Sequence, residues 1–172
     1  MKLEEKRILS EVNYFDLDNE ELIVPAGVTE IADDACAGLK SLESVVFPDT
    51  VRVIGKRAFA ECTNLSYIKL PNSLIRIEDT AFRGCVNLKQ VNIPNSVSEM
   101  GPNVFCGCNK LQRVKLPKNI TSIENRTFED CRSLKNLSLP STVRRIGKAA
   151  FDGCESLTEI KFPDFISVIE DE

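Results

Sequence analysis

The chain has 172 residues, 42% of them hydrophobic, with a net charge of −4 and no histidine or tryptophan. This length is about that of one domain, and without histidine the chain lacks the usual general base at neutral pH and every Ser-His or Cys-His pair. No apolar run approaches the length of a membrane-spanning helix, so we expect no membrane span. Residues 35–163 carry 19 bases and 12 acids, about +7, between acidic ends, a pattern that weakly favours an anionic partner.

The first 21 residues are expected to form a degenerate capping unit, of the kind that a stack of repeats needs at its end. A helical start to this unit is left open. Counted back from Pro25 with the 23-residue period described next, Ile8 and Val12 fall in an isoleucine and an alanine column, and the match dissolves after Val12. The segment has no apolar core like that of a signal peptide. A native Met1 predicts a cytoplasmic protein, and a removed signal peptide predicts a secreted or surface protein; the sequence leaves both open.

Seven of the eight prolines follow one another at intervals of 23 residues, at Pro25, Pro48, Pro71, Pro94, Pro117, Pro140 and Pro163. A fixed period of about 20–29 residues is typical of solenoids, in which each unit buries its apolar side only against its neighbours. We therefore assign residues 22–172 to one elongated solenoid of 23-residue units, expected to be a monomer.

Each unit is expected to contain one short strand that ends at its proline. Apolar residues stand six, three and one positions before the proline, as Leu65, Ile68 and Leu70 do before Pro71. This alternation predicts a strand with one buried face, and proline ends it because proline has no N–H for the ladder. Stacked units then form one parallel sheet with strands about 4.8 Å apart.

The rest of each unit is expected to be a return that forms no ladder and carries a turn of helix or 3₁₀-helix. Small residues precede most of the phenylalanines that stand eleven positions after the proline, at Phe59, Phe82, Phe105, Phe128 and Phe151. Glycines two positions later, at Gly38, Gly84, Gly107 and Gly153, predict a backbone bend. Hydroxyl residues two positions after the proline, such as Thr50 and Ser73, are expected to bond local backbone groups.

The pattern L-x-x-I-x-I-P-x-S-V-x-x-I-G-x-x-A-F-x-G-C resembles the BspA-type (Treponema pallidum type) leucine-rich repeats, and it covers residues 22–172. The resemblance implies an α/β-type repeat solenoid, a right-handed superhelix with a parallel sheet on its concave face and mostly strand and irregular returns. It also implies a non-catalytic surface or adhesin protein, because BspA-type proteins look like host-matrix-binding and coaggregation proteins.

Five of the seven cysteines also stand 23 residues apart, at Cys62, Cys85, Cys108, Cys131 and Cys154. A straight column of thiols without histidine does not converge on a tetrahedral zinc site, and parallel side chains disfavour disulfides between units. We expect reduced, buried, metal-free thiols that pack at a tight turn, which favours the cytosol or an anaerobic setting. Cys106 lies in an exposed-looking column, where it is a reactive surface thiol, a dimer link or incidental.

A partner is expected to bind the outward side chains of the strands, four and two positions before each proline, because packing does not dictate them. The central units place there an aromatic residue, amides and three bases: Tyr67, Lys69, Gln90, Asn92, Arg113 and Lys115. Tyrosine and arginine are frequent interface anchors. A second basic cluster that includes Arg144 and Arg145 lies on the returns.

These observations favour a protein-interaction module, whose partner would be a protein such as a host extracellular-matrix or cell-surface protein. An intracellular scaffold or a structural segment of a larger assembly is the alternative. No nucleic-acid partner is expected, because stacking aromatics and a contiguous basic stripe are not evident. The glycines serve the repeat and form no phosphate-binding motif, so we expect no cofactor and no enzyme activity.

Overall fold

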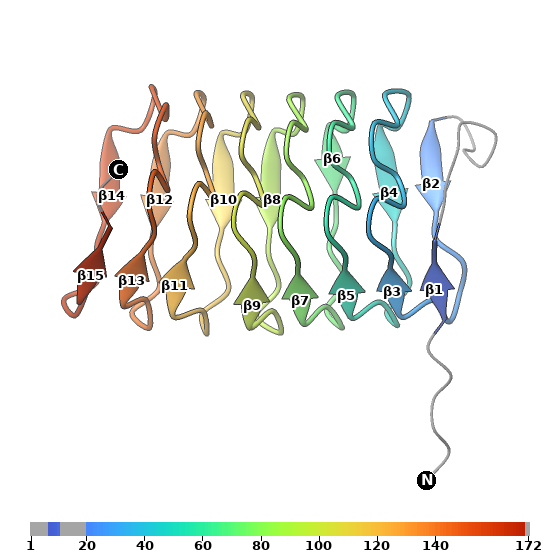
Figure 1. Ribbon diagram of the computed structural model, residues 1–172, viewed down its shortest axis with the longest axis horizontal. Helices are drawn as coiled ribbons and strands as arrows, with labels where there is room; N and C mark the ends of the chain where they lie inside the picture. Colours follow the sequence, from blue (N-terminus) through green and yellow to red (C-terminus); the bar gives the residue numbers. More distant parts are fainter. Residues whose placement is uncertain (1–6, 11–19, 171–172) are drawn as a thin grey trace, which may run out of the picture.

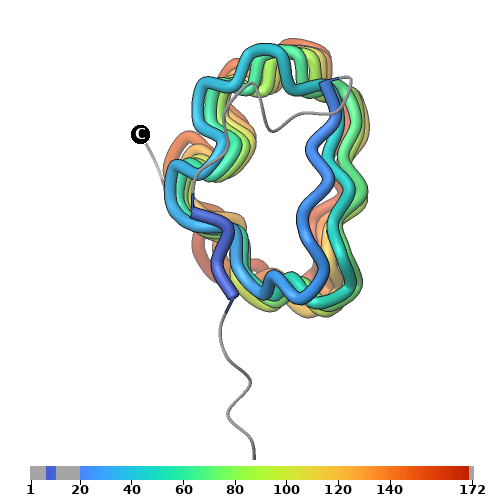
Figure 2. Tube along the Cα trace, turned by 90° about the vertical axis from the view of Figure 1, so that its right-hand side faces the viewer, coloured from blue at the N-terminus to red at the C-terminus, as the bar shows by residue number. Residues whose placement is uncertain are grey.

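The protein is described by a computed structural model that covers residues 7–10 and 20–170. The chain winds into a solenoid of stacked turns, each of which we call a rung and number from 1 to 7 by its proline, from Pro25 to Pro163 (Figure 1). Viewed along the axis, successive rungs superpose on one closed loop (Figure 2). Each complete rung contributes two short strands, which lie on different sides of that loop.

The first strand of each rung ends just before the proline, as the alternation of apolar residues predicts. These strands pair in parallel along the axis, in the order β2-β4-β6, β8-β10 and β12-β14. We call this the pre-proline sheet, and its strands are β2 (Glu21–Ile23), β4 (Ser44–Val46), β6 (Tyr67–Ile68), β8 (Gln90–Asn92), β10 (Arg113–Lys115), β12 (Asn136–Ser138) and β14 (Glu159–Lys161).

The return also forms a ladder of strands, so the expectation of a return without ladder bonds is wrong. A second set of parallel strands, which we call the return sheet, pairs in the orders β1-β3-β5-β7-β9 and β11-β13-β15. Its members are β1 (Ile8–Leu9), β3 (Glu30–Ile31), β5 (Val53–Ile54), β7 (Arg76–Ile77), β9 (Glu99–Met100), β11 (Ser122–Ile123), β13 (Arg145–Ile146) and β15 (Val168–Ile169).

Strand β1 enters the return sheet one residue out of the expected register. Leu9, and not Ile8, pairs with Ile31, and Leu9 packs against the core while Ile8 is exposed. The assignment of Ile8 to the isoleucine column is therefore wrong. Val12 lies outside the described residues, and so does most of the segment in which a helical start is expected. The capping role of the first 21 residues therefore stays a prediction.

No helix forms within residues 7–10 and 20–170, and the Ala-Phe segment is a series of reverse turns. Alternate N–H groups bond within the rung and to the next rung: Ala58 donates to Gly55 at 3.3 Å, and Phe59 donates to Ala81 at 2.8 Å. The backbone also takes positive φ at two points of each return, at Arg57 (54°) and Glu61 (59°) in rung 2. Two left-handed residues only four apart interrupt any helical run.

The core between the two sheets is a set of columns that repeat from rung to rung. Phe59, Phe82, Phe105 and Phe128 are fully buried, and together with Phe151 they stack with ring centroids 5.4–5.8 Å apart and planes within 6° of parallel. Rungs of identical backbone impose the same side-chain rotamer, so the rings lie parallel. A fully buried phenylalanine contributes roughly 3 kcal/mol through loss of its apolar surface from water.

Hydroxyl groups after the prolines connect neighbouring rungs rather than only their own turn. Thr50 donates to the carbonyl of Val28 at 2.7 Å, and Ser73 donates to that of Val51 at 2.6 Å. The expectation of backbone bonding is confirmed, although the acceptor belongs to the preceding rung.

Candidate functional site

The outward side chains of the pre-proline sheet form an exposed polar surface, which we call the pre-proline face. All six side chains that the sequence analysis selects are exposed on strands β6, β8 and β10 or directly beside them: Tyr67, Lys69, Gln90, Asn92, Arg113 and Lys115. The ladder sets Arg113 beside Gln90 and Lys115 beside Asn92. Inward neighbours such as Val91 are buried, so packing fixes the backbone and leaves these side chains free.

A hollow of about 350 Å³ brings five of these six residues together. Tyr67, Lys69, Gln90, Asn92 and Lys115 line it. Arg113, on the same strand as Lys115, lines a second hollow together with Asn136 and Glu159 of the following rungs. Tyr67, 52% exposed, also borders a hollow on its other side, so its ring stands between two depressions of the face. An exposed aromatic ring with recesses on both sides is suited to anchor a partner.

The three bases among these six residues have no acidic partner in the part of the chain that the structure describes. Every ion pair there lies elsewhere, and none includes Lys69, Arg113 or Lys115. Their hydrogen-bond donors are available to another molecule.

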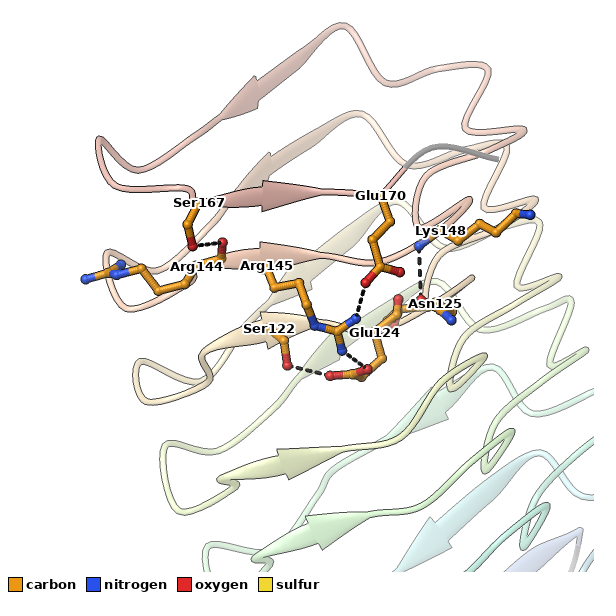
Figure 3. Close-up of polar contacts among 9 residues, drawn as sticks. Ser122, Glu124, Asn125, Arg144, Arg145, Lys148, Ser167 and Glu170 are labelled. Carbon is orange, nitrogen blue, oxygen red and sulfur yellow. Dashed lines mark hydrogen bonds and ion pairs between the residues drawn. The ribbon is translucent and has the colours of Figure 1, made fainter.

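On the strands of the return sheet, in contrast, the arginines form ion pairs. The Arg145 guanidinium of β13 donates to Glu124 on one side and, at 2.9 Å, to Glu170 on the other (Figure 3). Arg76 of β7 pairs with Glu78 of its own rung at 3.2 Å and with Glu99 of the next rung at 3.6 Å. These guanidinium groups are neutralised within the sheet.

Gly147 allows the backbone of rung 6 to pass close to Asn125 of rung 5. A Cβ atom there would lie 2.3 Å from the Asn125 Oδ1 atom and 2.6 Å from the Asn125 backbone nitrogen. The same Asn125 side chain accepts a hydrogen bond from the backbone N–H of Lys148 at 3.0 Å (Figure 3). Rungs 5 and 6 are thus fastened to each other by side chains as well as by the ladder.

Arg144, which directly precedes β13, is also engaged. Its guanidinium donates to the backbone carbonyls of Ser141 at 2.7 Å and Val143 at 2.9 Å, and it lies 5.8 Å from the centre of the Phe165 ring. Arg144 and Arg145 therefore hold the C-terminal rungs together, and they do not form a free anion-binding surface.

The cysteine column is a hydrogen-bonded feature of the core. The thiols of Cys62, Cys85, Cys108 and Cys131 are buried, as predicted, and that of Cys154 is half-buried. Each thiol donates to a backbone carbonyl of the preceding rung at 3.0–3.2 Å; Cys108, for example, donates to Phe82. Burial raises the pKa of the Cys62 thiol to about 12 and holds those of Cys85 and Cys108 well above the ordinary value. Such thiols react slowly in any compartment, so they do not indicate where the protein resides.

Cys106 is half-buried, and it is not an activated nucleophile. Burial, together with a 3.3 Å contact to the Glu129 carboxylate, raises its pKa to about 11. The thiolate is the reactive form, so this environment suppresses reactivity. Among residues 7–10 and 20–170, no three cysteine, aspartate or glutamate side chains converge as a metal-binding group.

Three further exposed lysines flank the face and were not selected from the sequence. Lys89 and Lys135 directly precede β8 and β12, and Lys118 directly follows Pro117. Their signal is the same 23-residue register, five positions before and one position after the proline. These two columns lie outside the strict alternation of the strand, which is why the alternation did not single them out.

Comparisons with known proteins agree on the fold. The family model of the BspA type leucine rich repeat region matches residues 29–143 and 122–172, with six copies. A leucine-rich repeat protein of Treponema pallidum is 33% identical and superposes with a TM-score of 0.88, over 94% of this chain and 77% of that one. A leucine-rich repeat protein of Bacteroides ovatus is 32% identical with a TM-score of 0.81, over 87% of this chain and 39% of that one.

A leucine rich cell surface protein of Faecalibacterium prausnitzii is 26% identical with a TM-score of 0.59, over 88% of this chain and 59% of that one. No curated protein sequence matches the chain. Within the described residues, no helix has the length and apolar character needed to cross a membrane.

Proposed function

The chain belongs to the BspA-type leucine-rich repeat family, a family of protein-interaction repeats, and on this premise we propose that it binds a partner protein through its pre-proline face without catalysing a reaction. The observation that carries the proposal is the contrast between unpaired bases on the pre-proline face and paired bases on the return sheet.

A solenoid can neutralise its own charges, as Arg145 does with Glu124 and Glu170. Lys69, Arg113 and Lys115 are not neutralised, although an acidic residue on an adjacent rung could neutralise each of them. Bases that are held on a rigid sheet and left unpaired bind a complementary partner with little loss of backbone entropy. Tyr67 supplies the aromatic contact that interfaces concentrate near their centre.

The finer proposal is a role at a bacterial surface, as an adhesive repeat that binds a host or partner-cell protein. The similar protein of Faecalibacterium prausnitzii is described as a cell surface protein, and that likeness supports the proposal. Its test is the location of the native protein: labelling of intact cells with an antibody to the repeat should stain them, and staining only after permeabilisation would contradict the surface role.

The binding face is tested by paired substitutions and a captured partner. Tyr67→Ala combined with Arg113→Ala should weaken partner binding by at least ~2 kcal/mol, roughly 30-fold, and leave the melting temperature unchanged because both side chains point away from the core. Arg144 and Arg145 are poor controls because they are part of the rung contacts. Arg52→Ala with Lys148→Ala removes two exposed bases outside the face and should change binding less than about 2-fold. A larger loss in this control pair would show that the partner binds elsewhere.

A further inference from the structure

The charges of the pre-proline face are segregated along its length, with the bases in the middle and acids towards the ends. The segments that cross the face in rungs 3 to 6, residues 66–72, 89–95, 112–118 and 135–141, contain six bases and no acid. We call these six residues the basic patch: Lys69, Lys89, Arg113, Lys115, Lys118 and Lys135.

The rungs on both sides of the basic patch carry acids. Residues 20–26 and 43–49 of rungs 1 and 2 contain four acids and no base, and rung 7 adds Glu159 and Asp164 beside Lys161. The positive field therefore has defined ends. An anionic ligand would be attracted to rungs 3 to 6 and repelled beyond them, which fixes its length and position.

All six side chains of the basic patch are exposed, and none takes part in an ion pair between residues that the structure describes. Neighbouring rungs are about 4.8 Å apart, well inside the Debye length of roughly 8 Å at physiological salt. The bases consequently repel one another, and a bound anionic chain would relieve that repulsion.

Amides between the bases identify the chemistry of the ligand backbone. Gln90, Asn92 and Asn136 are exposed on β8 and β12, and no side-chain hydrogen bond to another described residue engages them. Each amide offers a donor and an acceptor at one point. A peptide group also carries one donor and one acceptor, whereas sulfate and phosphate esters offer acceptors alone.

From these observations we infer that the ligand of the pre-proline face is an acidic polypeptide segment, bound in extended form along rungs 3 to 6. Its carboxylates would contact the basic patch, with Arg113 suited to bidentate contact, and its peptide groups would contact the amides. Tyr67 marks the end of the patch, where the basic rungs meet the acidic ones. The inference rests on the proposed function, because it names the kind of protein segment that this face binds.

Nucleic acid fits the patch less well. Single-stranded nucleic acid binds through successive aromatic platforms, and Tyr67 is the sole aromatic side chain among the residues that cross the face in rungs 3 to 6. The hydroxyl groups of a sulfated polysaccharide both donate and accept hydrogen bonds, so a heparin oligosaccharide is included in the experiment to separate it from an acidic peptide.

The test uses two peptides that differ only in charge: an alternating Glu-Ser peptide long enough to span four rungs, and the matching Gln-Ser peptide. Fluorescence anisotropy with the whole chain should show that the Glu-Ser peptide binds at least ~10-fold tighter and that added salt weakens it. Lys69→Glu with Arg113→Glu should abolish the difference. The control pair Arg52→Glu with Lys148→Glu makes the same change of net charge outside the face and should reduce it less than about 2-fold.

Equal affinity for the two peptides would overturn the inference. So would binding of a heparin oligosaccharide or a single-stranded oligonucleotide by a chain that does not bind the Glu-Ser peptide. Sedimentation that shows self-association, lost in Lys69→Glu with Arg113→Glu, would assign the face to a second copy and overturn it as well. If a captured partner still depends on Tyr67 and Arg113 while the Glu-Ser peptide does not bind, this inference fails and the proposed function stands.

Discussion

The pre-proline face and the return sheet use the same residue types for different purposes. On the return sheet, Arg76 and Arg145 each lie between two glutamates that come from their own or neighbouring rungs. On the pre-proline face, Arg113 and Lys69 lie among amides and other bases, and no ion pair within the described residues includes them. The arginines on the strands of the return sheet therefore stabilise the stack, whereas the bases of the pre-proline face are available to a partner.

This difference is informative because both surfaces rest on one core. Inward residues of the two sheets, such as Val91 and Ile77, belong to the same buried cluster. The folding energy is thus shared, and the contrast in charge pairing is confined to the outward side chains. Three sets of substitutions test this division, from the largest expected effect to the smallest.

Replacement of Phe105 by alanine should destabilise both sheets together. Phe105 is fully buried, with ring centroids of Phe82 and Phe128 at 5.7 and 5.8 Å. Loss of a buried phenylalanine costs about 3–5 kcal/mol, which urea unfolding will measure. Phe165→Ala, at a ring that is 70% exposed, is the matched control and should cost under about 1 kcal/mol. Separate unfolding transitions in Phe105→Ala would contradict the description of one shared core.

The cysteine column predicts a loss of stability in alkali. The unfolded thiols of Cys85 and Cys108 ionise near pKa 9.0, and burial holds both folded pKa values well above this. Their contribution is complete below pH 9 and is lost as the pH rises towards the folded pKa values, at about 1.4 kcal/mol per pH unit per thiol. Serine at both positions keeps a donor for the carbonyls of Phe59 and Phe82 and removes the ionisation.

Between pH 8 and pH 10, the free energy of unfolding of Cys85→Ser with Cys108→Ser should fall by about 3 kcal/mol less than that of the unaltered chain. The comparison is Cys106→Ser, which removes a single thiol with a folded pKa of about 11. This thiol also stays protonated up to pH 10 in the folded chain, so the single variant should show roughly half the effect of the double variant, about 1.4 kcal/mol. Equal alkaline slopes for the unaltered chain and the double variant would show that the column does not control the loss.

Single arginine substitutions sharpen the contrast between the two surfaces directly. Arg145→Ala leaves Glu124 and Glu170 without their shared partner and should cost about 1 kcal/mol, because the guanidinium is 36% exposed and partly screened. Arg113→Ala removes an unpaired base and should change stability by less than about 0.5 kcal/mol. Thermal unfolding of the two variants will compare these costs, and equal losses would show that Arg113 also stabilises the stack.

The sequence alone predicted the solenoid, the pre-proline strands and the buried columns, because each depends on one residue type that returns every 23 positions. Pro71, Phe82 and Cys85 each belong to such a column. The exposure of Tyr67, Lys69, Gln90, Asn92, Arg113 and Lys115 follows from the same alternation. Whether a partner contacts them is a property of two molecules, and it stays a prediction.

The return strands and the left-handed residues could not be derived in the same way. A two-residue strand such as Val53–Ile54 is too short to show an alternation. Residues at the first left-handed position vary in type and include Arg57, Thr80 and Ala149, with φ of 54°, 55° and 51°. Glycine would be the usual signal for this geometry. Here the hydrogen bonds between rungs impose the conformation on residues that do not favour it.

The direction of those hydrogen bonds has a mechanical consequence. Bonds such as Phe105 N–H to the Thr127 carbonyl, at 3.0 Å, run from one rung to the next. A force that pulls the two ends of the stack apart loads these bonds lengthwise, one interface after another, so the solenoid peels from an end instead of shearing as a whole. Each released rung of 23 residues adds roughly 80 Å of chain. A partner bound across rungs 3 to 6 would clamp the three interfaces between them, so a bound chain should lengthen less under tension than a free one.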